Sequence, residues 1–237
     1  MSLPNINSNL KHTFATLTPP VESLQILRTL NAGKPMTILE IGVGNGYIAN
    51  ELAKAGHRVV GMDLFDEPLG TLSPEVERIK FDIERQDVPD ELRGKFDVIL
   101  ALAILEHVWK EDEALSRMKV MLKTGGTLYA STPNINWWPF RIKYFLGKTV
   151  DDFHTCDHVK FWNLSRFAKV IREAGFSITK QFTSTGIPNL IWPFVRKGKG
   201  NKYEIAGKWL FVESDHAHPL LGYNQVVVAT PNLDELV

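Results

Sequence analysis

Residues 38–46 read Ile-Leu-Glu-Ile-Gly-Val-Gly-Asn-Gly, an apolar run that passes directly into three closely spaced glycines. The apolar half belongs to a predicted buried strand at residues 37–41, and a helical pattern begins at Tyr47. Glycine is needed where a backbone turns sharply, adopts a positive φ or lies flat against a ligand. The N-terminus of the following helix presents unpaired N–H groups and a partial positive charge that favours an anionic group. This stretch therefore predicts a ligand-binding turn between a strand and a helix.

Strand and helix patterns alternate along the chain on both sides of this turn. Strands are predicted at residues 58–62, 76–81, 96–101, 127–131, from 176, and at 225–229. Helices are predicted at residues 21–30, 47–55, 109–122 and 164–174. Strand–helix–strand order at short spacing is typical of a parallel sheet with crossover helices. The pattern therefore predicts an α/β protein.

Two connections are longer than this sheet needs, and we place them at about residues 132–160 and 183–223. Ordinary connections take about two to six residues, and extra length is where substrate loops and lids usually lie. We expect residues 1–237 to form a single domain with an N-terminal helical segment at 1–35 and these two insertions. The second insertion contains an apolar stretch at 190–195 that would be costly to expose, and a basic run at 196–202 whose plainest interpretation is a solvated loop.

Composition narrows the functional classes. Lys plus Arg and Asp plus Glu number 27 each, so zero net charge argues against bulk attraction to nucleic acid or to an anionic membrane. The single cysteine, Cys156, excludes an intramolecular disulfide and a multi-cysteine zinc site. No apolar run approaches the ~20 residues needed to cross a bilayer, and residues 1–20 lack a signal-peptide pattern. We expect a reducing compartment, most simply the cytoplasm.

An acidic residue accompanies the glycine turn. Asp63 closes the next predicted strand, at a distance where a carboxylate can hydrogen-bond a ribose diol. That arrangement serves dinucleotides and adenosyl cofactors alike. A dinucleotide fingerprint needs a third small residue, G-x-G-x-x-G/A, and here that position is Tyr47. Glu40 also places a carboxylate before the first glycine, which suits an ammonium group better than a pyrophosphate. These residues turn the prediction away from a nicotinamide dinucleotide.

The segment Glu40–Gly46 resembles motif I of class I S-adenosylmethionine-dependent methyltransferases. Further segments resemble that family in order and spacing, and they are Gly61–Leu64, Phe81–Glu84, Phe96–Ala101, Leu105–Val108 and Leu122–Gly126. Within the family, Leu105–Val108 and the ending Ser131–Asn134 look like the subgroup that contains quinone-biosynthesis O-methyltransferases. The resemblance covers residues 36–176 and a last strand at 225–230. It implies a three-layer, doubly wound, seven-stranded and mostly parallel sheet of the Rossmann-like methyltransferase type, with an antiparallel last strand.

The resemblance also implies which residues hold the methionine half of S-adenosylmethionine. The backbone of Gly42, Gly44 and Gly46, with Glu40 behind it, would cradle this part of the cofactor. The carbonyl of Ala101, at the end of the fourth strand, would lie near the methionine amino group.

For the adenosine half, the resemblance implies that Asp63 binds both ribose hydroxyls and that Leu64 lies against the adenine face. Asp82 would accept a hydrogen bond from the adenine amino group, and Ile83 would offer a backbone N–H to the ring. The prolines and glycine within residues 68–74 depart from the family pattern, so the helix there is expected to be short or broken.

Methyl transfer from a sulfonium requires alignment and exclusion of water rather than a dedicated nucleophile. A hydroxyl acceptor can also need a general base, most often histidine. His107 follows the fourth strand, at the edge where ligands bind in such sheets. The first insertion carries His154 and His158. We assign His107 and His154 to catalysis and His158 to binding of the acceptor. An alternative for His107 is a structural role at the start of a helix, with its side chain hydrogen-bonded to the backbone.

Two alternatives concern the same insertion. A divalent metal at His154 and His158 with Asp157 is conceivable, but paired histidines and loop acids are common without a metal, so none is expected. The aromatic segment that follows the fifth strand could be a small core or a lid over an apolar or aromatic acceptor. The residues assigned to the acceptor in this segment are Trp137, Trp138, Arg141 and Tyr144.

These observations predict an enzyme that transfers a methyl group from S-adenosylmethionine to a small-molecule acceptor, on oxygen, leaving S-adenosyl-L-homocysteine. An RNA or protein methyltransferase that uses residues 196–202 is one alternative. A non-catalytic protein that binds the cofactor or a partner is the other. The sequence leaves the identity of the acceptor and the oligomeric state open.

Overall fold

The computed structural model describes residues 21–149, 158–184 and 222–232. The predicted catalytic His154 and the acidic residues beside it lie outside the described residues, as do the apolar stretch 190–195 and the basic run 196–202.

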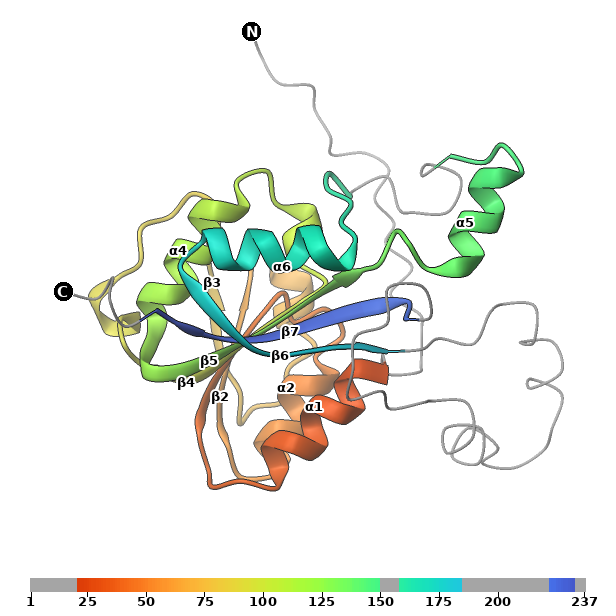
Figure 1. Cartoon of the computed structure of the whole chain (residues 1–237). Coiled ribbons are helices and arrows are strands. Elements are labelled where there is room, and N and C mark those ends of the chain that lie inside the picture. Colours follow the sequence, from red (N-terminus) through yellow and green to blue (C-terminus); the bar gives the residue numbers. More distant parts are fainter. Residues whose placement is uncertain (1–20, 150–157, 185–221, 233–237) are drawn as a thin grey trace, which may run out of the picture.

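A mixed sheet forms the centre of the described part of the chain (Figure 1). Its seven strands lie in the order β3-β2-β1-β4-β5-β7-β6, and β7 runs antiparallel to both neighbours while the other pairs are parallel. The strands are β1 (Thr37–Ile41), β2 (Arg58–Asp63), β3 (Glu77–Lys80), β4 (Phe96–Leu102), β5 (Leu122–Pro133), β6 (Phe176–Ser184) and β7 (Asn224–Pro231). The predicted mostly parallel sheet with an antiparallel last strand is confirmed.

Helices cover both faces of this sheet. The helices are α1 (Val21–Asn31), α2 (Tyr47–Lys54), α3 (Asp66–Leu69), α4 (Glu111–Met121), α5 (Trp138–Phe145) and α6 (Leu164–Glu173), with single 3₁₀ turns η1 (Asp90–Leu92) and η2 (Leu105–His107). Figure 1 shows α1 and α2 on one face and α4 and α6 on the other, which confirms the three-layer architecture. The short α3 also confirms the prediction of a short helix after β2.

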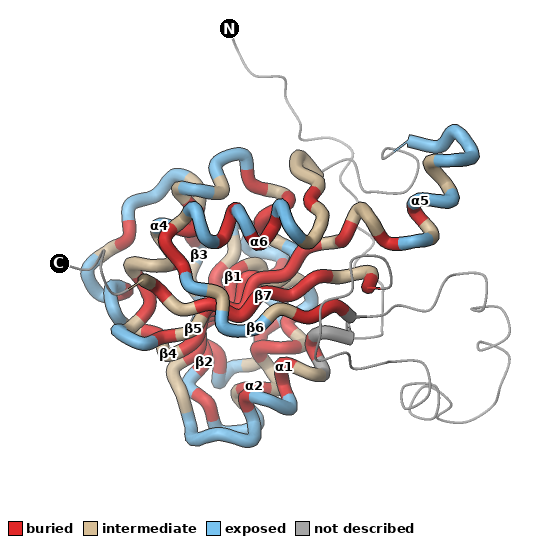
Figure 2. The backbone as a smooth tube through the Cα atoms, in the orientation of Figure 1, coloured by how far each residue is buried: buried red, intermediate tan, exposed pale blue. Residues whose placement is uncertain are grey.

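The central strands β1 and β4 are apolar at most positions because both of their faces are covered. In β1, Ile38 packs in the core beneath α1 and α2, whereas Leu39 and Ile41 pack in the core beneath α4 and α6. Successive side chains of a strand point to opposite faces, so a strand buried on both faces must be apolar at nearly every position. Figure 2 shows the buried residues concentrated along the central strands. Glu40 is the exception within β1, since it is charged by type and yet buried.

One strand begins earlier than predicted, and one helix was not predicted. The prediction started the fifth strand at Thr127, but β5 begins at Leu122, which pairs with Phe96 ahead of an irregularity in the ladder. Gly125, which lies inside this strand, adopts a φ of 77°. The helix α5 was not predicted, because residues 138–145 were interpreted only as an aromatic segment.

Candidate active site

The glycine turn between β1 and α2 has the backbone that its composition predicts. Gly42, Gly44 and Gly46 adopt φ values of 74°, 52° and 71°. A Cβ atom built on Gly42 would lie 1.9 Å from Cδ1 of Ile104, so the side chain of Ile104 packs directly against this glycine, whose φ of 74° also disfavours any other residue. A Cβ atom built on Gly44 would meet no atom within 4 Å, so the loop borders open space at that position. The loop is therefore tight on one side and accessible on the other, as a cradle for a ligand requires.

Glu40 lies behind this loop. Its side chain is 4% exposed, and its Oε2 accepts a hydrogen bond of 2.9 Å from the N–H of Ala49 in the first turn of α2. That N–H is one of those that a helix cannot pair internally. Burial raises the pKa of Glu40 to about 8; the hydrogen bond from Ala49 opposes this shift and the charge of Asp63 adds to it. The geometry gives Glu40 a structural task, which is to fix the start of α2, and its task toward the methionine half stays a prediction.

Asp63 connects the end of β2 to the glycine loop. Its Oδ2 accepts from the N–H of Val43 at 3.1 Å, and its Oδ1 accepts from the N–H of Phe65 at 3.0 Å. Partial burial raises the pKa of this carboxyl, although the hydrogen bonds from the backbone lower it. Leu64 and Phe65 beside it are 47% and 62% exposed. An acidic group flanked by exposed apolar side chains suits a ligand that joins a ribose to an aromatic base.

The remaining cofactor residues from the sequence follow β3 and end β4. Oδ1 of Asp82 accepts from the N–H of Glu84 at 2.9 Å, which holds the turn after β3. The side chain of Ile83 is buried in the core, and the contact of its backbone N–H with the adenine ring stays a prediction. Ala101 is fully buried in β4, paired with Ile41 on one side and Ala130 on the other. Strands β1 to β4 are parallel, so these residues and the glycine loop share the carboxyl edge of the sheet.

The chain turns abruptly where it leaves β4. Ala103 adopts a φ of 53°, and it is the only non-glycine residue with a positive φ in the part of the chain that the structure describes. Its N–H donates to both the carbonyl oxygen and the Oγ of Ser131, each at 3.1 Å. A left-handed alanine costs roughly 1–2 kcal/mol, and strain of this kind is concentrated at functional sites. The turn directs Ile104 against Gly42 and presents η2 beside the glycine loop.

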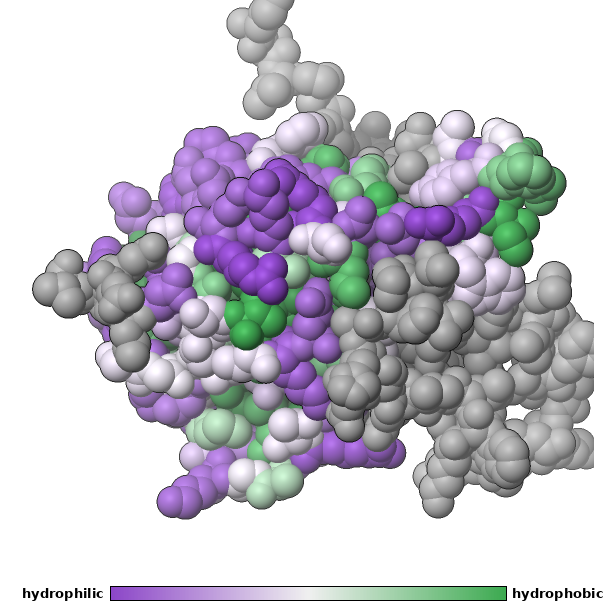
Figure 3. Space-filling model, viewed as in Figure 1, coloured by the Kyte–Doolittle hydropathy of each residue, from purple (hydrophilic) through white to green (hydrophobic). Residues whose placement is uncertain are grey.

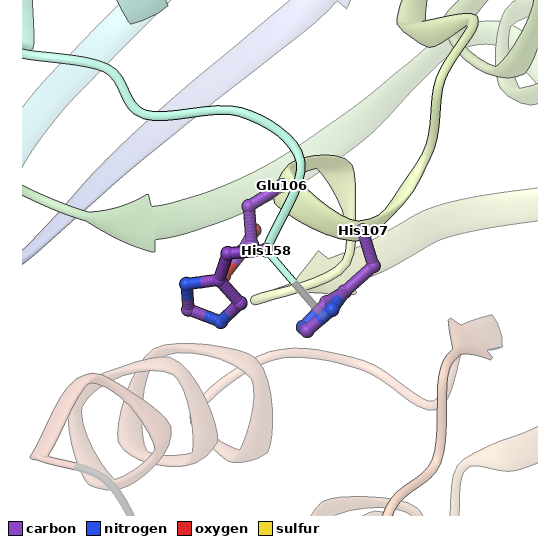
Figure 4. Close-up of side chains that lie close together, drawn as sticks. All are labelled: Glu106, His107 and His158. Carbon is purple, nitrogen blue, oxygen red and sulfur yellow. The ribbon is translucent and has the colours of Figure 1, made fainter. Parts of the chain in front are cut away.

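Three side chains with metal- or proton-binding groups meet at η2. Glu106, 1% exposed, and His107 come from η2, and His158 comes from the segment before α6. One ligand atom from each residue lies within 4.8 Å of the others, and the two imidazole rings meet edge to face with centroids 4.6 Å apart. Figure 4 shows both rings projecting to the same side of η2. The structure thus brings the predicted catalytic His107 together with the predicted acceptor-binding His158.

Backbone hydrogen bonds explain this meeting of distant segments. The carbonyl oxygen of Glu106 accepts from the N–H of Val159 at 2.8 Å and from the N–H of Lys160 at 3.2 Å. The Lys160 ammonium also pairs with the Glu111 carboxylate at the start of α4. Glu106 itself received no role from the sequence. A charged residue between the apolar Leu105 and Val108 was the available signal.

The aromatic segment after β5 divides into a buried and an exposed part. Trp137 and Phe140, 9% and 4% exposed, pack with Tyr223 at centroid separations of 5.0 to 5.9 Å. The sequence left open whether this segment forms a small core or a lid. The packing of Trp137 supports the small core. Burial raises the pKa of Tyr144, which is partly buried on α5.

The other face of α5 is open. Its exposed apolar residues Trp138, Ile142 and Phe145 are 38%, 50% and 91% exposed, and Arg141 is exposed among them. Figure 1 shows α5 beyond the carboxyl end of β5, standing off from the layers, and Figure 3 shows hydrophobic surface over its far end. The structure therefore holds Trp138, Arg141 and Tyr144 on one short helix outside the sheet, and their contact with an acceptor stays a prediction.

The fold and this edge define a doubly wound α/β domain with a cofactor-binding loop. The chain matches the family model described as a methyltransferase domain over residues 10–181, which is more than half its length, and it belongs to that family. The predicted class, S-adenosylmethionine-dependent methyltransferases, is thereby confirmed, and with it the cofactor of that class.

Relatives and solved structures agree with this assignment. The ubiquinone biosynthesis O-methyltransferase of Nitrobacter winogradskyi is 32% identical over 162 residues, covering 65% of this chain and 61% of the relative. The enzyme of that name from Acinetobacter baumannii (strain AYE) is 31% identical over 159 residues, covering 62% and 65%. The match thus spans less than two thirds of either relative's length.

Two solved methyltransferases share the fold. The S-adenosylmethionine-dependent methyltransferase of Thermotoga maritima gives a TM-score of 0.64 at 17% identity and covers 89% of each chain. That of Mesorhizobium loti gives 0.57 at 14% identity and covers 89% of this chain and 99% of its own. At such identities the likeness concerns the fold. Within the described residues, no helix combines the length and hydrophobicity that crossing a bilayer requires.

Proposed function

We propose that this chain transfers the methyl group of S-adenosylmethionine to an oxygen atom of a small-molecule acceptor, leaving S-adenosyl-L-homocysteine. The observation that carries the proposal is the contact of Ile104 with Gly42, which sets the cofactor loop beside the turn that bears Glu106 and His107. Donor and acceptor groups thereby share one edge of the sheet. The relatives named O-methyltransferases support oxygen as the acceptor atom.

When bound, S-adenosylmethionine supplies a methyl group that its sulfonium activates for in-line displacement. On this chain, the accessible backbone at Gly44 borders the space for the methionine half, and Asp63 accepts hydrogen bonds from the ribose hydroxyls. Leu64 covers one face of the adenine, and Asp82 with the N–H of Ile83 recognises its edge. Placement of the reactants can lower a barrier by about 7–11 kcal/mol, so these positioning residues carry most of the task.

On the acceptor side, an imidazole of His107 or His154 would accept the proton of the acceptor hydroxyl, and His158 would contact the acceptor. The exposed apolar face of α5, with Trp138 and Tyr144, would cover an apolar acceptor and keep water away. Arg141 would meet an anionic group on it. We further propose that residues 1–237 act as one domain with insertions near 132–160 and 183–223, and that the protein works in the cytoplasm.

The test uses the full chain, cofactor labelled in its methyl group, and a cell extract separated into small-molecule, RNA and protein fractions. We expect label in the small-molecule fraction, on hydroxyl-bearing compounds identified by mass spectrometry. The Asp63→Ala variant is expected to lose the transfer. Label confined to RNA or protein would replace this function by one of the alternatives. Cofactor binding without transfer to any fraction would contradict catalysis.

A further inference from the structure

We propose that Glu106, His107 and His158 bind a divalent transition-metal ion, for which Zn²⁺ is the best match, at the acceptor side of the candidate active site. No metal was expected from the sequence, and the insertion histidines considered there were His154 and His158. The structure instead joins His158 to two neighbouring residues of η2.

The donor set suits such an ion. Two imidazole nitrogens and one carboxylate oxygen are the protein ligands of many catalytic zinc sites, which keep a further position open. Softer thiolate ligands are missing from this cluster, and harder cations prefer oxygen-only sites, so zinc and its divalent neighbours are favoured. All three residues lie on the acceptor side of the edge, next to the segment that contacts the glycine loop.

The geometry is close to what a bound ion needs. Ligand bonds of about 2.0–2.2 Å in a tetrahedral site separate the ligand atoms by roughly 3.3–3.5 Å, whereas here they lie within 4.8 Å. Binding of an ion would therefore require the three side chains to rotate toward one another. Glu106 is fixed by burial and by the hydrogen bonds that its carbonyl accepts from Val159 and Lys160. His107 and His158 are partly exposed, so an ion from solvent can reach this side of the cluster.

The consequence for the reaction rests on the proposed function. A hydroxyl oxygen of the acceptor would fill an open position, and the cation would stabilise its oxyanion once the proton has passed to solvent. That oxygen then forms the new bond to the methyl carbon while the carbon–sulfur bond breaks, and the electron pair of that bond stays on sulfur. In this arrangement His107 is a ligand of the ion rather than the proton acceptor, and the proton of the acceptor hydroxyl passes to solvent.

The test is a titration of the chelator-treated full chain with Co²⁺, followed by its visible absorption, without cofactor or acceptor. We expect one equivalent to bind with an intensified spectrum that Zn²⁺ abolishes by displacement. His107→Ala and His158→Ala are each expected to weaken Co²⁺ binding by at least about 10–100-fold. Loss of a residue that only hydrogen-bonds a metal ligand already costs this much, and loss of the ligand itself should cost no less. The matched control is His57→Gln, at the amino end of β2, where the imidazole accepts a hydrogen bond from Met36.

Thermal unfolding keeps the result interpretable. Zn²⁺ is expected to raise the Tm of the wild type and of His57→Gln but not of His158→Ala, because an ion that binds only the folded chain stabilises it. Absence of Co²⁺ binding by the folded wild type would overturn the proposal, and so would binding that both alanine variants retain. Because no methyl transfer is measured, failure here leaves the proposed function standing. A metal-loaded protein that transfers no methyl group would refute the function and not the metal site.

Discussion

Replacing Glu40 by glutamine is expected to stabilise the protein at alkaline pH and to flatten its dependence on pH. The carboxyl is buried within β1, and its Oε2 accepts from the N–H of Ala49. Glutamine has nearly the same shape and keeps an oxygen for that hydrogen bond. The substitution therefore removes the ionisable group and little else.

The size of the effect follows from the raised pKa. The pKa of Glu40 is about 8 in the folded protein and has its ordinary value of 4.5 in the unfolded chain, so between these two pH values the folded protein keeps a proton that the unfolded chain has lost. A raised pKa gives stability that is complete below the unfolded value and is lost as the pH rises through the folded one. At 1.36 kcal/mol per unit, the wild type should lose roughly 3–4 kcal/mol of this contribution between about pH 5 and 8. The glutamine variant should lose none of it.

Urea unfolding of both proteins at a series of pH values measures the difference. The matched control is Glu51→Gln on α2, where the side chain pairs with Lys54 near solvent, and it should shift stability by no more than about 1 kcal/mol. The stability of Glu51→Gln should change with pH in the same way as that of the wild type. Parallel curves for the wild type and Glu40→Gln would refute the account of this buried carboxyl.

Further substitutions separate fold from function. Gly42→Ala should destabilise the chain by about 2 kcal/mol, because alanine is strained at a φ of 74° and its Cβ would displace the end of the Ile104 side chain. Gly44→Ala should cost only about 1 kcal/mol, from the strained φ alone, and urea unfolding measures both losses. Cofactor binding, measured by calorimetry, should weaken in both variants. Ala103→Gly should raise stability by roughly 1 kcal/mol through relief of its positive φ, and an unchanged urea midpoint would contradict this. Phe145 is 91% exposed, so Phe145→Ser should leave stability within about 0.5 kcal/mol of the wild type. The variant should raise the KM for an apolar acceptor, because α5 is proposed to cover that acceptor. An unchanged KM would contradict the proposed role of α5.

The cofactor half of the site was predictable because its chemistry is local in sequence. The glycine turn lies between adjacent elements, and Asp63 ends the next strand, so the parallel order of β1 and β2 brings them together without further information. Apolar runs of the right length predicted the strands for the same reason. The role of Glu40 in holding Ala49 was not visible, since a hydrogen bond from helix to strand depends on how α2 packs.

The acceptor half depends on contacts between distant segments. His158 reaches His107 only because Val159 and Lys160 donate to the carbonyl of Glu106, and no spacing in the sequence encodes those bonds. The helix α5 was missed because its aromatic residues alternate between the small core around Trp137 and open surface, which obscures a single apolar stripe. Side-chain identity predicted candidates for this half, and tertiary packing selected which of them meet.

The most direct test of the central claim is calorimetric titration of S-adenosylmethionine into the wild type, Asp63→Ala and the control Asp66→Ala, whose side chain is exposed on α3 and pairs with Lys80. The account predicts one equivalent bound by the wild type and by the control. It predicts that Asp63→Ala binds the cofactor about 10–100-fold more weakly, because the variant loses hydrogen bonds to a charged group that are worth about 1.5–3 kcal/mol. No binding by the folded wild type, or equal affinity in Asp63→Ala, would contradict the assignment of this edge to the cofactor.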